Sequence, residues 1–126
     1  DAVHVIVTNP LDAMAQQALK VSGLNPGKVF GMAGILDTAR YRTFISQELN
    51  VSVDSVSAYV LGGHGDTMVP VVGTTNVAGT PITKLIDPVR LEEIVQRARD
   101  GGAEIVNYLK TGEVAEDCLM NLQDEV

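Results

Sequence analysis

The sequence predicts an α/β fold that opens with a strand, a helix and a second, parallel strand. Residues 3–7 form a β-rich run that is apolar on both faces, as in a buried strand of a parallel sheet. Apolar residues then recur at helical spacing over residues 11–19. After an Asn-Pro-Gly turn at residues 25–27, residues 29–33 are typical of another strand. This order predicts a βαβ unit.

Both ends of the first helix carry residues typical of helix ends. Asn9 is predicted to be its N-cap, and Pro10 stands at the first helical position, where proline is well tolerated. Gly23 is predicted to end the helix in the left-handed conformation.

Shorter elements are predicted next. A helix is expected from Asp37 to Leu49, with a polar turn after it. Residues 56–61 are predicted to form a strand, and residues 69–74 its hairpin partner or the next strand. Residues 76–81 are predicted to form a loop.

The longest helical signal comes last in the sequence. Asp87 is predicted to cap this helix, and Pro88 lies in its first turn. The apolar period of 3.6 residues continues through Gly101 and Gly102 to Leu109, which predicts one helix that bends at the glycines, and not two helices.

Composition excludes several classes of protein. The chain has 126 residues, a length typical of one domain, and 45% of them are hydrophobic. Its one cysteine, Cys118, excludes an internal disulfide and a cysteine-rich zinc module. It contains no apolar run of about 18 residues, and its N-terminus lacks the pattern of a signal peptide. We therefore expect a cytoplasmic protein with no membrane partner.

The charge is acidic and unevenly distributed. Sixteen acidic residues against nine lysines and arginines give a formal charge of −7. Five of the acidic residues, and none of the basic ones, lie in residues 113–126. Because no basic stripe is present to neutralise phosphates, we expect no nucleic-acid partner.

His64 has the most distinctive surroundings in the sequence. Gly62, Gly63 and Gly65 permit backbone conformations that other residues resist, and they keep bulk away from the imidazole. A histidine placed where a strand ends lies at the rim of a sheet, where α/β proteins bind ligands. The alternative is that the histidine has no functional role and only lies in a glycine-rich turn that Asp66 caps. The spacing leaves both readings open, and its place in a loop favours a role in proton transfer.

Asp37 and Arg40 are three residues apart in the first turn of a predicted helix, so both point to about the same side. An arginine there can bind a carboxylate with two parallel hydrogen bonds. Asp37 could orient an imidazole by accepting a hydrogen bond from its ring N–H. The alternative, which the spacing alone favours, is that Asp37 is only the N-cap and that Arg40 only pairs with it.

Asn9 and Cys118 are weaker candidates. The Asn9 side chain either caps the first helix or faces a ligand from the carboxyl end of a parallel strand. Cys118 has no glycine-rich frame, and a nucleophilic pair with His4 or His64 is not favoured. Two histidines so far apart in sequence do not predict a metal site.

Three motifs together resemble the lactate/malate dehydrogenase family. They are VIVTNPLD at residues 5–12, GILDTARYR at 34–42 and GGHGDTMVP at 62–70, and they occur in the family's order and at about its spacing. The third is similar to the form in lactate-dehydrogenase-like malate dehydrogenases of bacteria and archaea, whereas lactate enzymes usually carry Glu before the histidine. The resemblance covers about residues 3–112.

The resemblance implies a role for each candidate residue. His64 matches the catalytic acid/base, and Asp37 the carboxylate that holds it and stabilises its protonated form. Arg40 matches the arginine that grips the substrate carboxylate. Asn9 matches the asparagine beside the nicotinamide and the reacting oxygen, so it would bind both substrate and cofactor. Arg42 in the same motif is interpreted as structural or interfacial.

The resemblance also implies the domain organisation. Residues 1–33 are expected to be the last part of a dinucleotide-binding domain, the end of a Rossmann-like parallel sheet. Residues 34–112 are expected to form part of the α+β catalytic domain, and residues 113–126 an acidic tail that does not match the family. The sequence contains no Gly-x-Gly-x-x-Gly motif. We therefore expect a fragment of a family chain at least twice this length, inactive by itself.

The activity implied is that of an NAD-dependent malate dehydrogenase of the tricarboxylic acid cycle. Such an oxidoreductase transfers a hydride between NAD and a small dicarboxylic 2-hydroxy or 2-oxo acid, and its full-length form is expected to be a homo-oligomer. Two alternatives stay open: a lactate or other 2-hydroxy-acid dehydrogenase, and a non-catalytic remnant that acts as a binding or assembly module through an uncovered apolar face.

Overall fold

The computed structural model describes residues 2–64 and 67–109, which divide into two compact units. Of these residues, 2–33 and 105–109 belong to the first unit and 34–104 to the second. The predicted acidic tail and Cys118 lie outside the described residues, as do Gly65 and Asp66.

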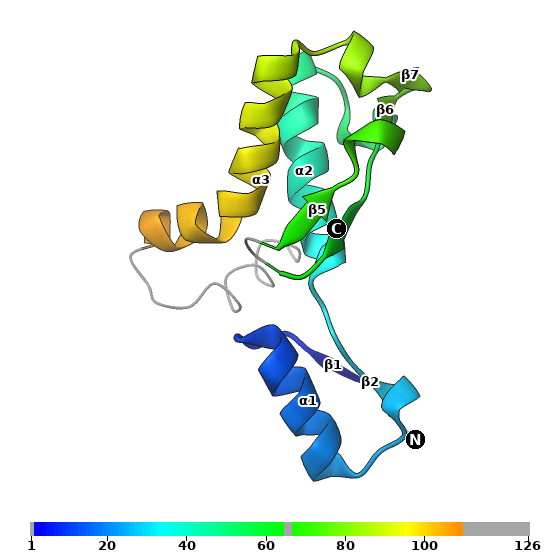
Figure 1. The fold of residues 1–126 in the computed structure, drawn as a ribbon, viewed down its shortest axis with the longest axis vertical. Helices are drawn as coiled ribbons and strands as arrows, with labels where there is room; N and C mark the ends of the chain where they lie inside the picture. The colour runs from blue at the N-terminus through cyan, green and yellow to red at the C-terminus, as the bar shows by residue number, and fades with distance from the viewer. Residues whose placement is uncertain (1, 65–66, 110–126) are drawn as a thin grey trace. The chain divides into compact units, whose positions relative to one another are not determined.

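The first unit contains the predicted βαβ arrangement (Figure 1). Strand β1 (His4–Ile6) pairs in parallel with β2 (Val29–Gly31), and helix α1 (Leu11–Ser22) connects them. A single 3-10 turn over Pro26–Lys28 leads into β2. The predicted end of α1 is confirmed, because Gly23 adopts a φ of 63° and its N–H bonds to the carbonyl of Leu19.

The start of α1 differs from the prediction. Pro10 is the N-cap residue, with an extended ψ of 122°, so the first helical residue is Leu11. No side chain caps this helix, and Asn9 is exposed. The prediction that Asn9 is the N-cap is therefore wrong, because Pro10 remains extended and moves Asn9 one position away from the cap.

The burial of the first strand also differs from the prediction. His4 and Val5 are exposed, and Phe30 of β2 is exposed too. Among the described strands, β1 and β2 pair only with each other. Helix α1 packs closely against β2, where a Cβ added at Gly31 would lie 3.0 Å from Leu11 Cγ. The apolar run thus forms a strand, but its burial on both faces is not seen in the described residues.

The second unit packs two helices against short antiparallel strands (Figure 1). Its helices are α2 (Gly34–Leu49) and α3 (Pro88–Leu109), and only the part of α3 up to Glu104 belongs to this unit. Its strands are β3 (Val56–Ser57), β4 (Val60–Gly62), β5 (Met68–Pro70), β6 (Asn76–Val77) and β7 (Thr80–Pro81). β4 pairs with β5, and β6 lies between β3 and β7. Side chains from both helices and the strands form one core, in which Tyr41, Ile45, Ile82 and Ala98 are fully buried.

Helix α2 begins three residues before its predicted start. Its first residue is Gly34, and a Cβ there would lie 3.1 Å from the carbonyl oxygen of Val60. The glycine therefore permits the close approach of α2 to β4. As a result Asp37 lies inside the first turn of α2, and the interpretation of Asp37 as the N-cap is wrong.

Helix α3 is confirmed at its start and along its length. Asp87 caps it, because its Oδ1 accepts a hydrogen bond of 2.9 Å from the N–H of Val89. The helix then continues from Pro88 through both glycines, Gly101 and Gly102, as one element. No helix in the part of the chain that the structure describes is long and apolar enough to cross a bilayer.

Two of the strand predictions need correction. The single strand predicted over residues 56–61 is divided into β3 and β4, which belong to different ladders. The loop predicted over residues 76–81 is a hairpin, with β6 and β7 joined by Ala78 (φ 48°) and Gly79 (φ 85°). Two adjacent left-handed residues form the tight turn that suits the twist of a hairpin. The hairpin partner predicted for β4 over residues 69–74 is confirmed only in its first part, because β5 ends at Pro70 and a 3-10 turn follows over Val72–Thr74.

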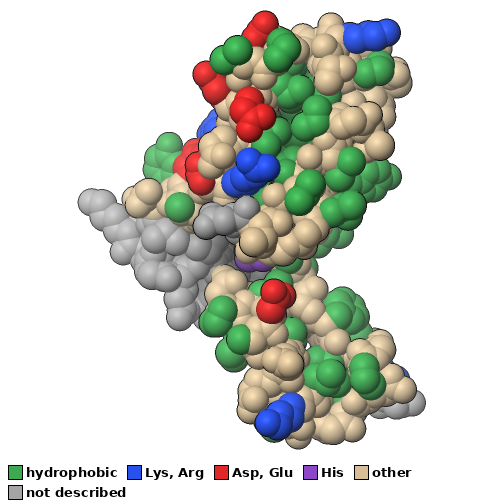
Figure 2. Space-filling view, viewed as in Figure 1, with side chains coloured by type: hydrophobic (Ala, Val, Ile, Leu, Met, Phe, Trp, Pro, Cys, Tyr) green, Lys and Arg blue, Asp and Glu red, His purple; other side chains and the backbone are tan. Residues whose placement is uncertain are grey.

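Large apolar side chains remain on the surface of both units, and Figure 2 shows them distributed over the visible face. The more exposed ones in the first unit include Val3, Val5, Val21, Phe30 and Tyr108, and those in the second include Ile35, Tyr59, Leu61, Val69 and Val89.

Candidate active site

The loop that carries His64 depends on two glycines of the β4–β5 hairpin. Gly62 ends β4 with a φ of +83°, and a Cβ there would lie 2.6 Å from the carbonyl oxygen of Thr67. A Cβ on Gly63 would collide with the Thr67 hydroxyl. Gly62 and Gly63 therefore lie tightly against Thr67, which agrees with the predicted need for glycine beside His64.

Asp37 meets His64 from the first turn of α2. His64 Nδ1 lies 2.9 Å from Asp37 Oδ2, a hydrogen bond between residues 27 positions apart in sequence. Asp37 is 1% exposed, whereas His64 is 27% exposed. The buried carboxylate therefore orients an imidazole that remains open to solvent on part of its surface.

Thr38, the residue after Asp37, ties β4 to α2. Its hydroxyl accepts a hydrogen bond of 2.9 Å from the N–H of Val60. This bond fixes the strand that ends two residues before His64 against the helix that carries Asp37. The sequence interpretation missed Thr38, because a bond between residues 22 positions apart leaves no local pattern.

Arg40 lies on the same side of α2 as Asp37, as the spacing predicts. Its Nη1 is 3.5 Å from Asp37 Oδ1, and its side chain is 11% exposed. Asp37 thus lies between a histidine on one oxygen and a guanidinium on the other. Arg42 lies elsewhere on the helix and donates from Nη2 to the carbonyl of Val53 at 2.8 Å, which agrees with a structural role.

Asn9 belongs to the first unit and the other three predicted site residues to the second. It lies just beyond the carboxyl end of β1, its side chain is exposed, and it does not cap α1. Of the two interpretations of Asn9, the one in which capping occupies its side chain is therefore contradicted. In the described residues no cluster of three or more His, Cys, Asp or Glu side chains could hold a metal ion.

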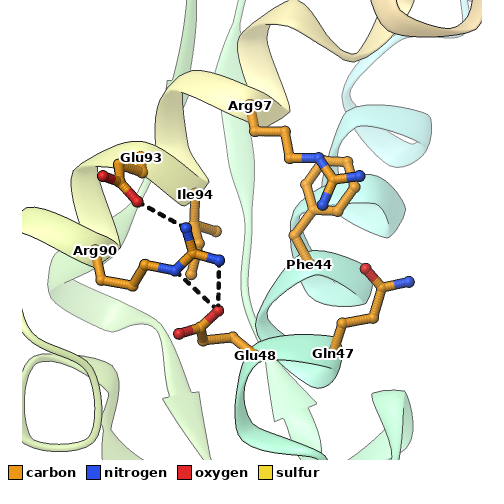
Figure 3. Close-up of a pocket in the computed structure, with 7 residues that line it drawn as sticks. All are labelled: Phe44, Gln47, Glu48, Arg90, Glu93, Ile94 and Arg97. Carbon is orange, nitrogen blue, oxygen red and sulfur yellow. Dashed lines mark hydrogen bonds and ion pairs between the residues drawn. The ribbon is translucent and has the colours of Figure 1, made fainter.

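A separate cavity of about 220 Å³ lies between α2 and α3, and none of the four predicted site residues lines it (Figure 3). Arg90 bonds there to Glu48 through Nε and Nη2, at 2.9 and 2.8 Å, and to Glu93 at 2.6 Å. Arg97 stacks on the Phe44 ring, 4.2 Å from its centroid. Both arginines already have partners, and their contacts with Glu48 and Phe44 hold α3 against α2. We call these four residues the α2–α3 clasp, and the cavity lies among them.

The ion pairs of Arg90 and Arg97 shift the pKa values of their partners. The hydrogen bond from Arg90 lowers the pKa of Glu48, and the bond from Arg97 lowers the pKa of Glu104. The carboxylates of Glu48 and Glu93, in turn, raise the pKa of Arg90. Of these pairs, only Arg90–Glu48 joins α3 to α2, the helix that positions Asp37 and Arg40.

Comparisons with known proteins agree on one family. The family model described as the lactate/malate dehydrogenase, alpha/beta C-terminal domain matches residues 35–114. A malate dehydrogenase of Rhodopirellula baltica is 62% identical over 112 residues, which cover 89% of this chain and 36% of that one. The chain thus spans about a third of the length of the curated relatives that it matches.

Solved structures give the same result for the fold. The malate dehydrogenase of Salinibacter ruber is 50% identical with a TM-score of 0.85, over 90% of this chain and 37% of that one. A lactate dehydrogenase of Cryptosporidium parvum, solved with lactic acid and nicotinamide adenine dinucleotide, is 45% identical with a TM-score of 0.82. That match covers 88% of this chain and 37% of the other.

Proposed function

Because the chain belongs to the lactate/malate dehydrogenase family, we propose that it forms part of an enzyme that converts malate to oxaloacetate and back, with NAD as cofactor. The observation that carries the proposal is the buried Asp37 between His64 and Arg40. A proton carrier, a carboxylate that orients it and a guanidinium are the groups that this chemistry needs. The names of the most similar relatives support malate as the substrate.

His64 is proposed to move the proton. Its Nδ1 is engaged by Asp37, so Nε2 is the ring atom that meets the substrate hydroxyl. Nε2 takes the hydroxyl proton when malate is oxidised and returns it when oxaloacetate is reduced. Asp37 stabilises the imidazolium that forms, because its buried carboxylate lies 2.9 Å from the ring.

Arg40 is proposed to bind a carboxylate of the substrate. A guanidinium presents two parallel N–H groups that match the two oxygens of a carboxylate. Because Arg40 lies beside Asp37 on α2, the bound carboxylate would lie close to the proton carrier, His64. This arrangement orients the reacting carbon relative to His64, and orientation contributes a large part of enzymatic rate acceleration.

The residues of this chain fit one part of NAD only. Asn9 lies exposed beyond the carboxyl end of β1, the edge where parallel sheets bind ligands, so it is the residue proposed to contact the nicotinamide. The 126 residues contain no Gly-x-Gly-x-x-Gly loop to cradle the pyrophosphate. When bound, NAD would accept or supply the hydride, and residues outside this sequence would hold its phosphates.

A second candidate is a lactate or other 2-hydroxy-acid dehydrogenase, since a histidine, an aspartate and an arginine serve any 2-hydroxy acid. The similarity to the Cryptosporidium parvum lactate dehydrogenase favours it to a lesser degree. A non-catalytic binding or assembly module is the third candidate, and the exposed apolar side chains support it.

We also propose that the longer enzyme is a homo-oligomer. We propose the cytoplasm as its location, since one cysteine in 126 residues is typical of a reducing compartment.

A chimera tests the proposal. The matching 112 residues of the Rhodopirellula baltica malate dehydrogenase are replaced by those of this chain. NADH oxidation is followed with oxaloacetate and, separately, with pyruvate. We expect turnover of oxaloacetate, whereas the 126-residue chain alone is expected to be inactive. A folded chimera that binds NADH but turns over neither acid would contradict the proposal, and preference for pyruvate would favour the second candidate.

A further inference from the structure

Gly101 interrupts the buried stripe of α3. Leu91, Ile94 and Ala98 lie three and four residues apart along the helix, and all three are buried. The next position on this face is Gly101, which is also buried. Glycine is a poor helix former and contributes no side chain to a core, so the spacing alone would favour an apolar residue here.

The side chain of Arg40 fills the space at this position. A Cβ added at Gly101 would lie 3.2 Å from Arg40 Cδ and 3.7 Å from Arg40 Nε. The first distance is tighter than ordinary van der Waals contact, so a methyl group there would displace the arginine. At Gly102, the next residue of the same helix, an added Cβ meets nothing within 4 Å.

We propose that Gly101 is a positioning residue for Arg40. The bare backbone of α3 at this point lets the arginine lie against the helix, which sets the direction of its guanidinium beside Asp37. The inference rests on the proposed function, in which Arg40 binds the substrate carboxylate. Two parallel hydrogen bonds depend strongly on direction, so a displacement of a few tenths of an ångström weakens that grip.

Alanine substitutions at the two glycines test the proposal in the chimera. Both remove a glycine from α3, and therefore both improve helix propensity, but only Gly101→Ala places a methyl group against Arg40. We expect Gly101→Ala to raise KM for oxaloacetate about tenfold, with a smaller fall in kcat and unchanged NADH affinity. Gly102→Ala is expected to leave KM within a factor of about two.

A measurement on the 126-residue chain tests the contact without any activity. The NMR signal of the Arg40 Nε–Hε group is assigned by its loss in Arg40→Lys. We expect Gly101→Ala to shift this signal and Gly102→Ala to leave it in place.

The NMR and kinetic results together decide whether Gly101 positions Arg40. An unmoved Arg40 signal in Gly101→Ala, or a moved signal with unchanged KM, would overturn the positioning role. Equal effects of both alanine variants would also overturn it, since they would point to helix stability. An inactive parent chimera would contradict the proposed function and with it the role in substrate binding, while the NMR signal would still report on the contact.

Discussion

Asp37 is the residue on which the candidate site depends. It is nearly fully buried, and its two oxygens face the His64 ring and the Arg40 guanidinium. A buried carboxylate requires partners of this kind, because an unpaired charge inside a protein is strongly destabilising. The same contacts that stabilise Asp37 therefore orient the two groups proposed to meet the substrate.

The backbone at Gly62 should tolerate no side chain. With a φ of +83° and the Thr67 carbonyl 2.6 Å from an added Cβ, Gly62→Ala is both strained and crowded. We expect it to lower the free energy of unfolding by roughly 1–3 kcal/mol in urea titrations. The matched control is Gly73→Ala, where an added Cβ meets nothing within 4 Å, and there we expect a change below about 0.5 kcal/mol. Equal losses in the two variants would contradict this account of the loop.

Arg40→Lys keeps the charge but removes the planar fork of donors. We expect it to raise KM for oxaloacetate in the chimera at least about tenfold, because an ammonium group cannot form two parallel bonds to a carboxylate. NADH affinity should stay unchanged, and fluorescence titration checks it. An unaltered KM would mean that Arg40 does not bind the substrate.

The α2–α3 clasp should weaken in acid. Arg90 lowers the pKa of Glu48 below its ordinary value of 4.5, so the unfolded chain binds this proton more tightly than the folded one. The stabilisation is therefore present above pH 4.5 and is lost as the pH falls through the lowered pKa. We expect Glu48→Gln to lower the urea midpoint of the chain at pH 7 and to have little effect below about pH 3.

Glu92→Gln serves as the control for this measurement. Glu92 lies on α3, and the structure shows no ion pair for it among the described residues. Its substitution should change the urea midpoint little at either pH. A Glu48→Gln effect that is the same at pH 3 and pH 7 would show that the ion pair is not its cause.

Long periodic elements could be predicted from the sequence, and contacts between distant elements could not. The apolar period and the Asp87 cap predicted α3, and the order of apolar runs predicted the βαβ unit. The hairpin at Ala78 and Gly79 was missed because alanine is an unusual residue for a left-handed turn position. The early start of α2 at Gly34 reflects its approach to Val60, which no local pattern records.

In the candidate site too, local patterns could be predicted from the sequence and contacts between distant elements could not. The motif predicted that Asp37 and Arg40 share one side of a helix, and their contact agrees with it. The spacing left open whether Asp37 meets His64, and only the tertiary packing of the β4–β5 hairpin on α2 brings them together. The roles of His64, Asp37, Arg40 and Asn9 in catalysis remain predictions, and the variants of His64 and Arg40 test two of them.

At the scale of the whole molecule, the chain carries the groups proposed for acid/base catalysis, whereas its sequence lacks the glycine-rich motif that cradles phosphates. Dinucleotides are held largely by a glycine-rich loop and the N-terminus of the helix after it, and the 126 residues contain no such loop. We therefore expect the chain alone to bind NADH weakly or not at all in calorimetry. Micromolar binding by the isolated chain would contradict this view of how the cofactor is held.

The most direct test of the central claim is the turnover of a His64→Asn chimera. A positioned acid/base contributes about 10²–10⁴-fold to the rate, so we expect kcat with oxaloacetate to fall at least about a hundredfold. NADH affinity and the unfolding temperature should change little, which separates loss of chemistry from loss of fold. If turnover survives within a factor of about three, His64 is not the proton carrier, and the role assigned to the Asp37–His64 pair is wrong.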